Sequence, residues 1–154
     1  MNDRAHHFCT FHVDNLFLGV DAKQVQEVIR YQQMTRVPLA RSAISGLINL
    51  RGQIVTAIDL RSRLCLPLRT PNTLPMNVVV RDGEHAVSLL VDRIGDVVEV
   101  DDELFEPLPS TVRAAIRGLI RGAYKLPDRL LLVLDTVGIL DESDSLVADA
   151  RRAG

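Results

Sequence analysis

The chain has 154 residues, close to the usual length of one domain and long enough to bury a core without a disulfide or a metal ion. Hydrophobic residues make up 47% and charged residues 25%, which excludes a disordered or low-complexity chain. The net charge is -2 and the aromatic residues are limited to four Phe and two Tyr, so nucleic acid and anionic lipid are disfavoured as partners.

Short apolar runs separated by turn residues predict a mainly β chain with many short strands. The first pair of strands is a hairpin over 8–20, because Asp14 and Asn15 accept turn geometry. After it, Asp21 can act as an acidic N-cap, and helical spacing relates three apolar residues, Val25, Val28 and Ile29. The pattern therefore predicts a short amphipathic helix over 21–29.

The middle of the chain carries a second hairpin and then a loop. The hairpin is predicted over 47–58, since Gly52 at its centre can adopt a positive φ. Asp59 can cap a short helix that reaches about Leu66. Residues 67–75 contain three prolines and no apolar period, which indicates an exposed loop or linker.

Two more hairpins are predicted in the second half. One covers 77–91 and turns at Asp82-Gly83, the strongest short turn signal in the chain. The other covers 122–134 and turns at Pro127-Asp128. The remaining residues, 141–154, are predicted to form a C-terminal tail.

A weak internal repeat relates the two halves of the chain. Asp59 follows Gly46 by 13 residues, and Asp135 follows Gly122 by the same interval, with a hairpin in each. Two related halves of about five strands suit two small closed β-barrels, which leave no open sheet edges. We therefore expect one domain, 1–154, with a first barrel at about 14–66 plus crossing terminal segments and a second at about 77–135.

Catalytic signatures are missing from the sequence, which contains no phosphate-binding loop, zinc-protease motif or nucleophile elbow. The nearest metal candidates share the N-terminal segment: His6, His7, Cys9 and His12. Their spacing does not fit the usual zinc patterns, and on a strand His12 faces away from His7 and Cys9. We expect no enzyme activity, no cofactor and no metal.

Two charged segments are more simply explained as solvent-exposed surface than as functional sites. The acidic residues between Asp96 and Glu106 lack the spaced ligands of a calcium loop and are expected in a solvated loop between the barrels. Arg113, Arg117 and Arg121 recur every four residues and are expected on one solvated helix face, with an acidic partner as the alternative.

A series of short motifs in a fixed order gives the chain a family resemblance. The most specific is Asn49-Leu50-Arg51-Gly52, and the others include Val25-Gln26-Glu27-Val28-Ile29, Leu89-Leu90-Val91-Asp92, Glu106-Pro107-Leu108-Pro109 and Leu132-Val133-Leu134-Asp135. Over residues 8–140 the sequence resembles the bacterial chemotaxis coupling protein family, CheW.

The resemblance implies a non-catalytic adaptor built from two five-stranded SH3-like β-barrels with short helices. Such an adaptor joins the cytoplasmic tip of chemoreceptors to the regulatory domain of the histidine kinase CheA. The N-terminus lacks the basic flank and apolar stretch of a signal peptide, and no apolar run is as long as a membrane span, which predicts a cytoplasmic protein without direct membrane insertion. The resemblance implies that this protein is recruited to membrane-bound receptor arrays.

The resemblance also implies site residues. A receptor-binding groove between the barrels would include four apolar residues, Leu16, Val25, Val28 and Val98. Glu27 and Arg51 match an acidic and a basic residue of the family and would form a polar pair at the binding face. Ile54 and Val55 would lie near the kinase interface. For each of the apolar residues, packing in a barrel core is the alternative role.

Two other functions compete with chemotaxis coupling. A CheW-like adaptor can also serve a type IV pilus or another chemosensory pathway, and the sequence does not separate these outputs. A nucleic-acid-binding double β-barrel is the rival of a different class, opposed by the acidic balance and the few aromatic residues.

Overall fold

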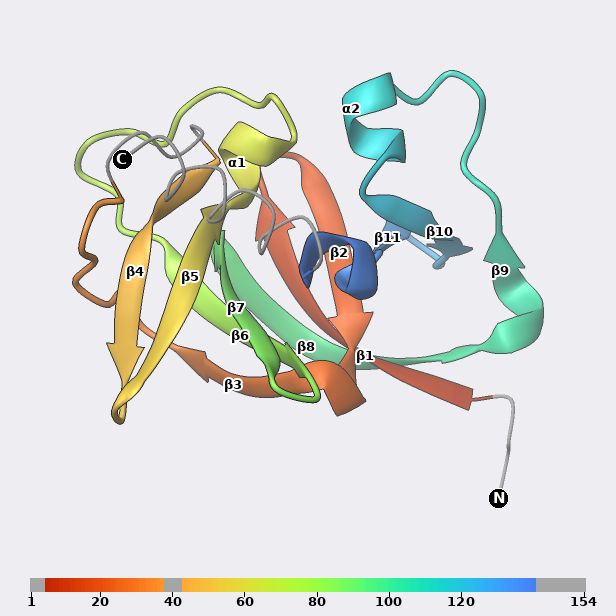
Figure 1. The fold of residues 1–154 in the computed structure, drawn as a ribbon. Coiled ribbons are helices and arrows are strands. Elements are labelled where there is room, and N and C mark those ends of the chain that lie inside the picture. Colours follow the sequence, from red (N-terminus) through yellow and green to blue (C-terminus); the bar gives the residue numbers. More distant parts are fainter. Residues whose placement is uncertain (1–4, 38–42, 141–154) are drawn as a thin grey trace.

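The computed structural model of the protein describes residues 5–37 and 43–140, and most of these residues lie in strands (Figure 1). The strands are β1 (Ala5–Val13), β2 (Leu16–Asp21), β3 (Val25–Ile29), β4 (Ile44–Leu50), β5 (Gln53–Asp59), β6 (Met76–Asp82), β7 (His85–Val91), β8 (Arg93–Asp101), β9 (Phe105–Glu106), β10 (Ile120–Lys125) and β11 (Leu130–Leu134). The helices are short: η1 (Ala22–Gln24), α1 (Leu60–Arg63), η2 (Asp102–Leu104) and α2 (Ala114–Arg117). A further helical turn follows β11 at 136–140.

The strands form two sheets, which confirms the predicted mainly β fold. One sheet has six strands in the order β8-β1-β2-β11-β10-β9, and the other has five in the order β3-β6-β7-β5-β4. All four predicted hairpins are present as antiparallel pairs: β1 with β2, β4 with β5, β6 with β7, and β10 with β11. Each sheet also contains one parallel pair, β5 with β7 and β11 with β2.

Each sheet curls so that its two edges meet. In the five-stranded sheet, the chain that leaves β3 forms a bridge with β4, where the backbone groups of Thr35 and Leu47 exchange hydrogen bonds of 2.9 and 2.7 Å. In the six-stranded sheet, the chain that leaves β8 continues through η2 to β9, which pairs with β10 at the opposite edge. This closure leaves few unpaired backbone groups and supports the expected barrels.

One hydrophobic cluster joins the two sheets. It includes buried side chains from the six-stranded sheet, such as Phe11 and Leu18, together with Val78 and Leu89 from the five-stranded sheet. Two smaller clusters fill the individual sheets, one around Phe8 and Leu131 and the other around Ile48 and Val55. Because the largest cluster is shared, the two sheets pack as one unit.

The internal repeat is real. Gly46 and Gly122 each follow a register shift in the pairing of their hairpin. The backbone N–H of Asp59 donates to the Ala43 carbonyl at 2.9 Å, and that of Asp135 donates to the Leu119 carbonyl at 2.7 Å. Asp59 accepts a hydrogen bond from the Arg61 N–H and Asp135 accepts one from the Gly138 N–H, so both carboxylates cap the helical turn that follows.

The two glycines are required because the chain crosses over them. A Cβ at Gly46 would lie 2.7 Å from the Thr35 carbonyl oxygen, which takes part in the bridge to β4. A Cβ at Gly122 would collide with the Phe105 ring of β9. Glycine at each position therefore lets the closing segment of its barrel approach the hairpin.

The predicted boundary between the halves was wrong, because each sheet draws strands from both. The hairpin β6-β7 (76–91), assigned to the second barrel, lies between β3 and β5 of the first, and β1-β2 lies beside β8 and β11 of the second. Because β6-β7 lies in the first sheet and β1-β2 in the second, β7 pairs in parallel with β5, and β2 pairs in parallel with β11. The expected tail, 141–154, lies outside the described residues.

The predicted helix over 21–29 was also wrong. Only 22–24 is helical, and Val25–Ile29 is a strand paired with β6. The Asp21 side chain does cap the turn, accepting from the Lys23 N–H at 2.9 Å. Val25, Val28 and Ile29 are β-branched, and pairing with a neighbouring strand outweighs their weak helical period.

Two charged segments also differ from expectation. Arg93–Asp101 is a strand, so the first acidic residues lie on β8 instead of a loop. The helix α2 ends at Arg117 and Arg121 lies on β10, so the three arginines do not share a helix face. Among the described residues, no helix is long and apolar enough to cross a membrane.

Candidate functional site

The predicted polar pair is formed at one end of the five-stranded sheet. Glu27 on β3 accepts a hydrogen bond from Arg51 Nη2 in the β4–β5 turn. The Glu27 side chain is 16% exposed and the Arg51 side chain 77%, so the carboxylate is set into the surface and the guanidinium covers it. The second carboxylate oxygen, Oε1, is buried and has no hydrogen-bond partner among the described residues.

The turn that carries Arg51 has a backbone geometry that arginine does not favour. Arg51 has φ 52° and Gly52 has φ 87°, the two positive values of a type I′ turn, in which Asn-Gly is the usual pair. A non-glycine residue in this region costs about 1 kcal/mol. Asn49 helps to hold the turn, because its side-chain oxygen accepts from the Gly52 N–H at 2.9 Å. The cost is consistent with selection of the Arg51 side chain for a role beyond the turn.

Strand β3 is an edge strand with an exposed apolar side chain next to the polar pair. Val28 is 40% exposed, whereas Val25 and Ile29 are half-buried and pack on core clusters. Arg81 on β6 extends the polar surface here, donating to the side-chain oxygens of Gln26 and Gln53 at 2.6 and 2.5 Å. These contacts join β3, β6 and the β4–β5 turn around Glu27 and Arg51, while strand alternation points the Val28 side chain to the other face of β3 from Glu27.

The other two predicted groove residues have different environments. Val98 on β8 is half-buried against the Phe8 cluster, and the register places Phe8 between Val98 and Asp21, so Val98 lies about 10 Å from the start of η1. Its neighbour Val97 is 59% exposed and was missed. Because Val100 is buried, strand alternation points Val98 inward and Val97 outward, a signal that the sequence did contain.

Leu16 lies elsewhere. It is at the far end of β2 from Val25 and lines a pocket with residues of the β10–β11 hairpin. The six residues of β2 alone span roughly 17–20 Å, so Leu16 does not share a surface with Val28.

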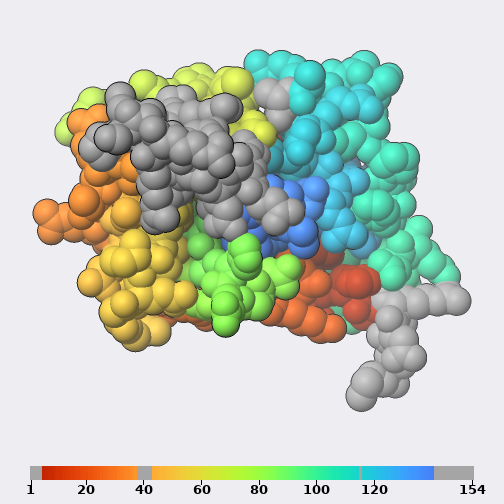
Figure 2. Space-filling model, viewed as in Figure 1, coloured from red at the N-terminus to blue at the C-terminus, as the bar shows by residue number. Residues whose placement is uncertain are grey.

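The two residues predicted for the kinase interface point in opposite directions. Ile54 is 61% exposed and lines a shallow pocket of about 330 Å³ with Gln53, Thr56 and the β6–β7 residues Glu84, His85 and Ala86. Figure 2 shows these two hairpins, in yellow and green, next to each other on one face. Val55 is 1% exposed and belongs to a core cluster, so its side chain is not available to a partner.

An ion network that the sequence did not reveal joins the two sheets. Asp92, between β7 and β8, accepts from Arg61 of α1 at 2.7 Å and from Arg69 of the 67–75 loop at 3.0 Å. It also accepts from the Asp14 backbone N–H in the β1–β2 turn at 2.7 Å. Burial alone would raise the pKa of Asp92, but these hydrogen bonds outweigh it and lower the pKa to about 2.

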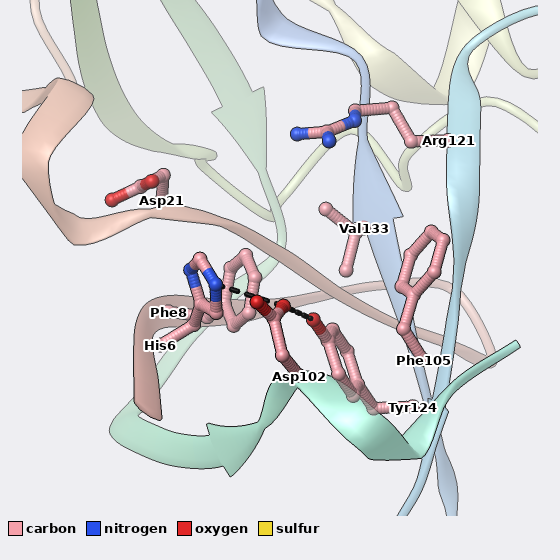
Figure 3. A pocket seen from close by; sticks show the side chains of 8 residues that line it. All are labelled: His6, Phe8, Asp21, Asp102, Phe105, Arg121, Tyr124 and Val133. Atoms are coloured by element: carbon pink, nitrogen blue, oxygen red, sulfur yellow. Dashed lines mark hydrogen bonds and ion pairs between the residues drawn. The ribbon is translucent and has the colours of Figure 1, made fainter. Parts of the chain in front are cut away.

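The N-terminal histidines take part in separate contacts. Figure 3 shows Asp102 between His6 and Tyr124, and the His6 Nε2 to Asp102 Oδ1 distance is 2.8 Å. His7 lies beside Glu99, and His12 packs against Phe17. Within residues 5–37 and 43–140, no group of three or more His, Cys, Asp or Glu side chains is arranged to hold a metal ion.

Comparison with known proteins identifies the family of this chain. The model of the CheW-like domain matches residues 7–144, which is most of the chain. The chain belongs to the CheW-like domain family. Its relatives include a chemotaxis protein CheW of Bacillus subtilis, 34% identical over 88% of this chain and 86% of that protein, and one of Klebsiella aerogenes, 29% identical over 92% and 86%.

Solved structures agree with the family. The crystal structure of the scaffolding protein TtCheW from Thermoanaerobacter tengcongensis matches with a TM-score of 0.76 at 26% identity, over 84% of this chain and 88% of that one. The family match, the chemotaxis relatives and the shared fold together identify this chain as a chemotaxis adaptor.

Proposed function

We propose that this CheW-family protein couples the cytoplasmic tip of chemoreceptors to the regulatory domain of a CheA-type histidine kinase. It acts in the cytoplasm, at membrane-bound receptor arrays, and catalyses no reaction. The CheW-like match over residues 7–144 is the observation that carries the proposal. Two exposed apolar side chains on different strands, Val28 on β3 and Ile54 on β5, support it because an adaptor needs apolar contact surface for two partners.

The receptor face is assigned to Val28 and the Glu27–Arg51 pair, with Val25 and Val98 half-buried at its margin. A receptor tip is an α-helical segment, and an amphipathic helix can bury apolar side chains on Val28 while its polar groups meet the pair. The exposed Arg51 guanidinium offers donors to a receptor carboxylate. The kinase face is assigned to Ile54.

Two titrations test the proposal. The purified protein is titrated with a soluble fragment of the chemoreceptor tip and, separately, with the regulatory domain of the CheA-type kinase, both from the source organism. We expect saturable one-to-one binding of each. Absence of binding to both partners would contradict the proposal.

Replacement of Arg51 by asparagine separates binding from folding. An asparagine at this position would suit the positive φ and keep the type I′ turn, but it removes the guanidinium from Glu27. For Arg51→Asn we expect a melting temperature within a few degrees of the wild type and receptor-tip binding weakened by about tenfold. Calorimetric titration measures the second effect, and unchanged receptor affinity in a folded variant would remove the pair from the receptor face.

Replacement of Ile54 by aspartate tests the kinase face. Ile54 is exposed, so Ile54→Asp should fold normally and weaken kinase-domain binding at least about tenfold, since a carboxylate would be buried against an apolar surface. Receptor-tip binding should be unchanged. The control is Leu68→Asp, at an exposed leucine of the 67–75 loop, which should leave both affinities intact. Equal loss of kinase binding in both variants would show a nonspecific charge effect.

A further inference from the structure

A second pocket lies on the six-stranded sheet, away from the faces assigned above. It is formed where the β1–β2 hairpin meets the β10–β11 hairpin and has a volume of about 300 Å³. Its lining includes His12, Leu16, Phe17, Arg129, Leu130 and Leu132. A volume of this size is at the lower end of the range for binding pockets in proteins.

The internal repeat relates this pocket to the one that contains Ile54. The offset of 76 residues between Gly46 and Gly122 also relates Ile54 to Leu130 and Gln53 to Arg129. Like Ile54, Leu130 is exposed beside the tip of its hairpin. The two pockets therefore occupy the same place in two copies of one structural unit.

The residues on the opposite wall of the Ile54 pocket also correspond, under the repeat, to residues of the Leu130 pocket. The parallel pairs Thr56 with Val87 and Leu132 with Leu18 occupy matching positions in the two sheets, so β2 corresponds to β7. Where the Ile54 pocket has polar or small side chains, His85 and Ala86, this pocket has Leu16 and Phe17. It is therefore the more apolar of the two.

The charge at the rim is positive. The Arg129 guanidinium lies 3.9 Å from the centre of the Phe17 ring, and its Nη1 is 3.3 Å from His12 Nε2. Arg93 on β8 is directly opposite His12 in the register. Arg129 also lies 3.8 Å from the carboxylate of Asp128, which is largely exposed and offsets little of this charge.

His12 stays neutral beside these arginines. Burial, followed by the charges of Arg93 and Arg129, lowers the pKa of His12 below its ordinary value. Because arginine can only donate, Nε2 accepts and the proton lies on Nδ1, which is buried with no partner among the described residues.

From this geometry we propose that the pocket is a third protein-docking site, for a partner segment in which an apolar side chain is followed by an acidic residue. The apolar side chain enters between Leu16 and Leu130, and the carboxylate binds the exposed side of Arg129, with Arg93 adding long-range attraction. The Ile54 pocket carries Glu84 at its rim and does not attract the same segment. The site would let the adaptor bind a further protein without displacing the receptor or the kinase.

Selection from a random octapeptide display library tests the proposal on the full-length protein. We expect enrichment of peptides with Leu, Ile or Phe next to Asp or Glu, and a consensus peptide should perturb the NMR resonances of Leu130 and Arg129. Binding should weaken as salt rises, because the rim charges are exposed. The variant Arg129→Glu should weaken the consensus peptide at least tenfold and shift selection toward Lys and Arg. The matched control, Gln53→Glu in the related pocket, should change neither result.

Several results would overturn the proposal. They are no enrichment, enrichment without acidic residues, perturbation centred on Ile54, or an unaltered selection with a folded Arg129→Glu variant. A dimer that Arg129→Glu dissociates would assign the pocket to a second copy of this chain instead. A thermal melt confirms folding, and Leu130→Ala provides an independent variant that lowers affinity without changing charge. None of these outcomes depends on whether Ile54 binds a kinase.

Discussion

Val28→Arg is expected to leave the protein folded and to weaken binding of the receptor tip at least about tenfold, a loss of about 1.4 kcal/mol or more. Val28 is 40% exposed on an edge strand, so the longer side chain can extend into solvent in the free protein. In the complex the arginine would be buried against the apolar face of the receptor helix, where an unpaired charge is costly. Kinase-domain binding should remain, since Ile54 lies on another strand, β5, and its side chain is not changed.

The control for this variant is Leu74→Arg, which adds the same charge at an exposed leucine of the 67–75 loop. Thermal melts of both variants and separate titrations with receptor tip and kinase domain make the comparison. A folded Val28→Arg variant with normal receptor affinity would show that Val28 lies outside the receptor face. An unfolded variant would show that Val28 has a core role despite its exposure.

Asp92→Asn is expected to lower the free energy of unfolding by about 2 kcal/mol at pH 7 and the melting temperature by about 4–8 °C. The neutral amide would leave Arg61 and Arg69, which both donate to Asp92, without their shared anion. It would also weaken the contact with the Asp14 N–H that links the β1–β2 turn to the β7–β8 junction. The matched control Asp128→Asn, at an exposed carboxylate, should change the melting temperature little.

The Asp92 network also makes the free energy of unfolding depend on pH. The pKa of Asp92 is about 2 in the folded protein and near 3.8 in an unfolded chain, so the folded state favours the ionised form. Its contribution is therefore complete above about pH 5 and is lost as the pH falls toward 2. Denaturant melts from pH 7 to pH 2 should show the wild type converging on Asp92→Asn. A constant difference between the two proteins across this range would show that ionisation of Asp92 is not the cause.

The hairpins could be predicted from the sequence because their turn residues specify them. Asp14 adopts the positive φ that Asp tolerates, and Gly52 and Gly83 adopt the values that only glycine accepts easily. The repeat was detectable for a similar reason, since Gly46 and Gly122 stand where another chain segment crosses within contact distance. Local chemistry fixes such features, so a single sequence reveals them.

Features that depend on distant pairing were missed. The five residues of β3 have a helical apolar period, and only the antiparallel pairing with β6, about 50 residues away, makes them a strand. The exchange of hairpins between the sheets likewise depends on the parallel pairs β5 with β7 and β11 with β2, which no local pattern encodes.

The candidate site was partly predictable. Family resemblance identified Glu27 and Arg51, and the structure brings them together, although Glu27 lies on a strand and not on a helix. The Asp92 network draws on four separate segments and the Leu130 pocket on two hairpins that are far apart in the sequence, so their residues come together only in the folded chain. The burial of Val55 beside exposed Ile54 follows from strand alternation, whose phase the sequence alone did not settle.

The central claim is that one molecule of this protein binds receptor and kinase together. Analytical ultracentrifugation of the protein mixed with receptor-tip fragment and kinase regulatory domain, each labelled with a different chromophore, measures this directly. We expect a single boundary that contains all three components and that loses only the receptor signal when Val28→Arg replaces the wild type. Two binary complexes that compete for the protein, with no ternary species at saturating concentrations, would contradict the account.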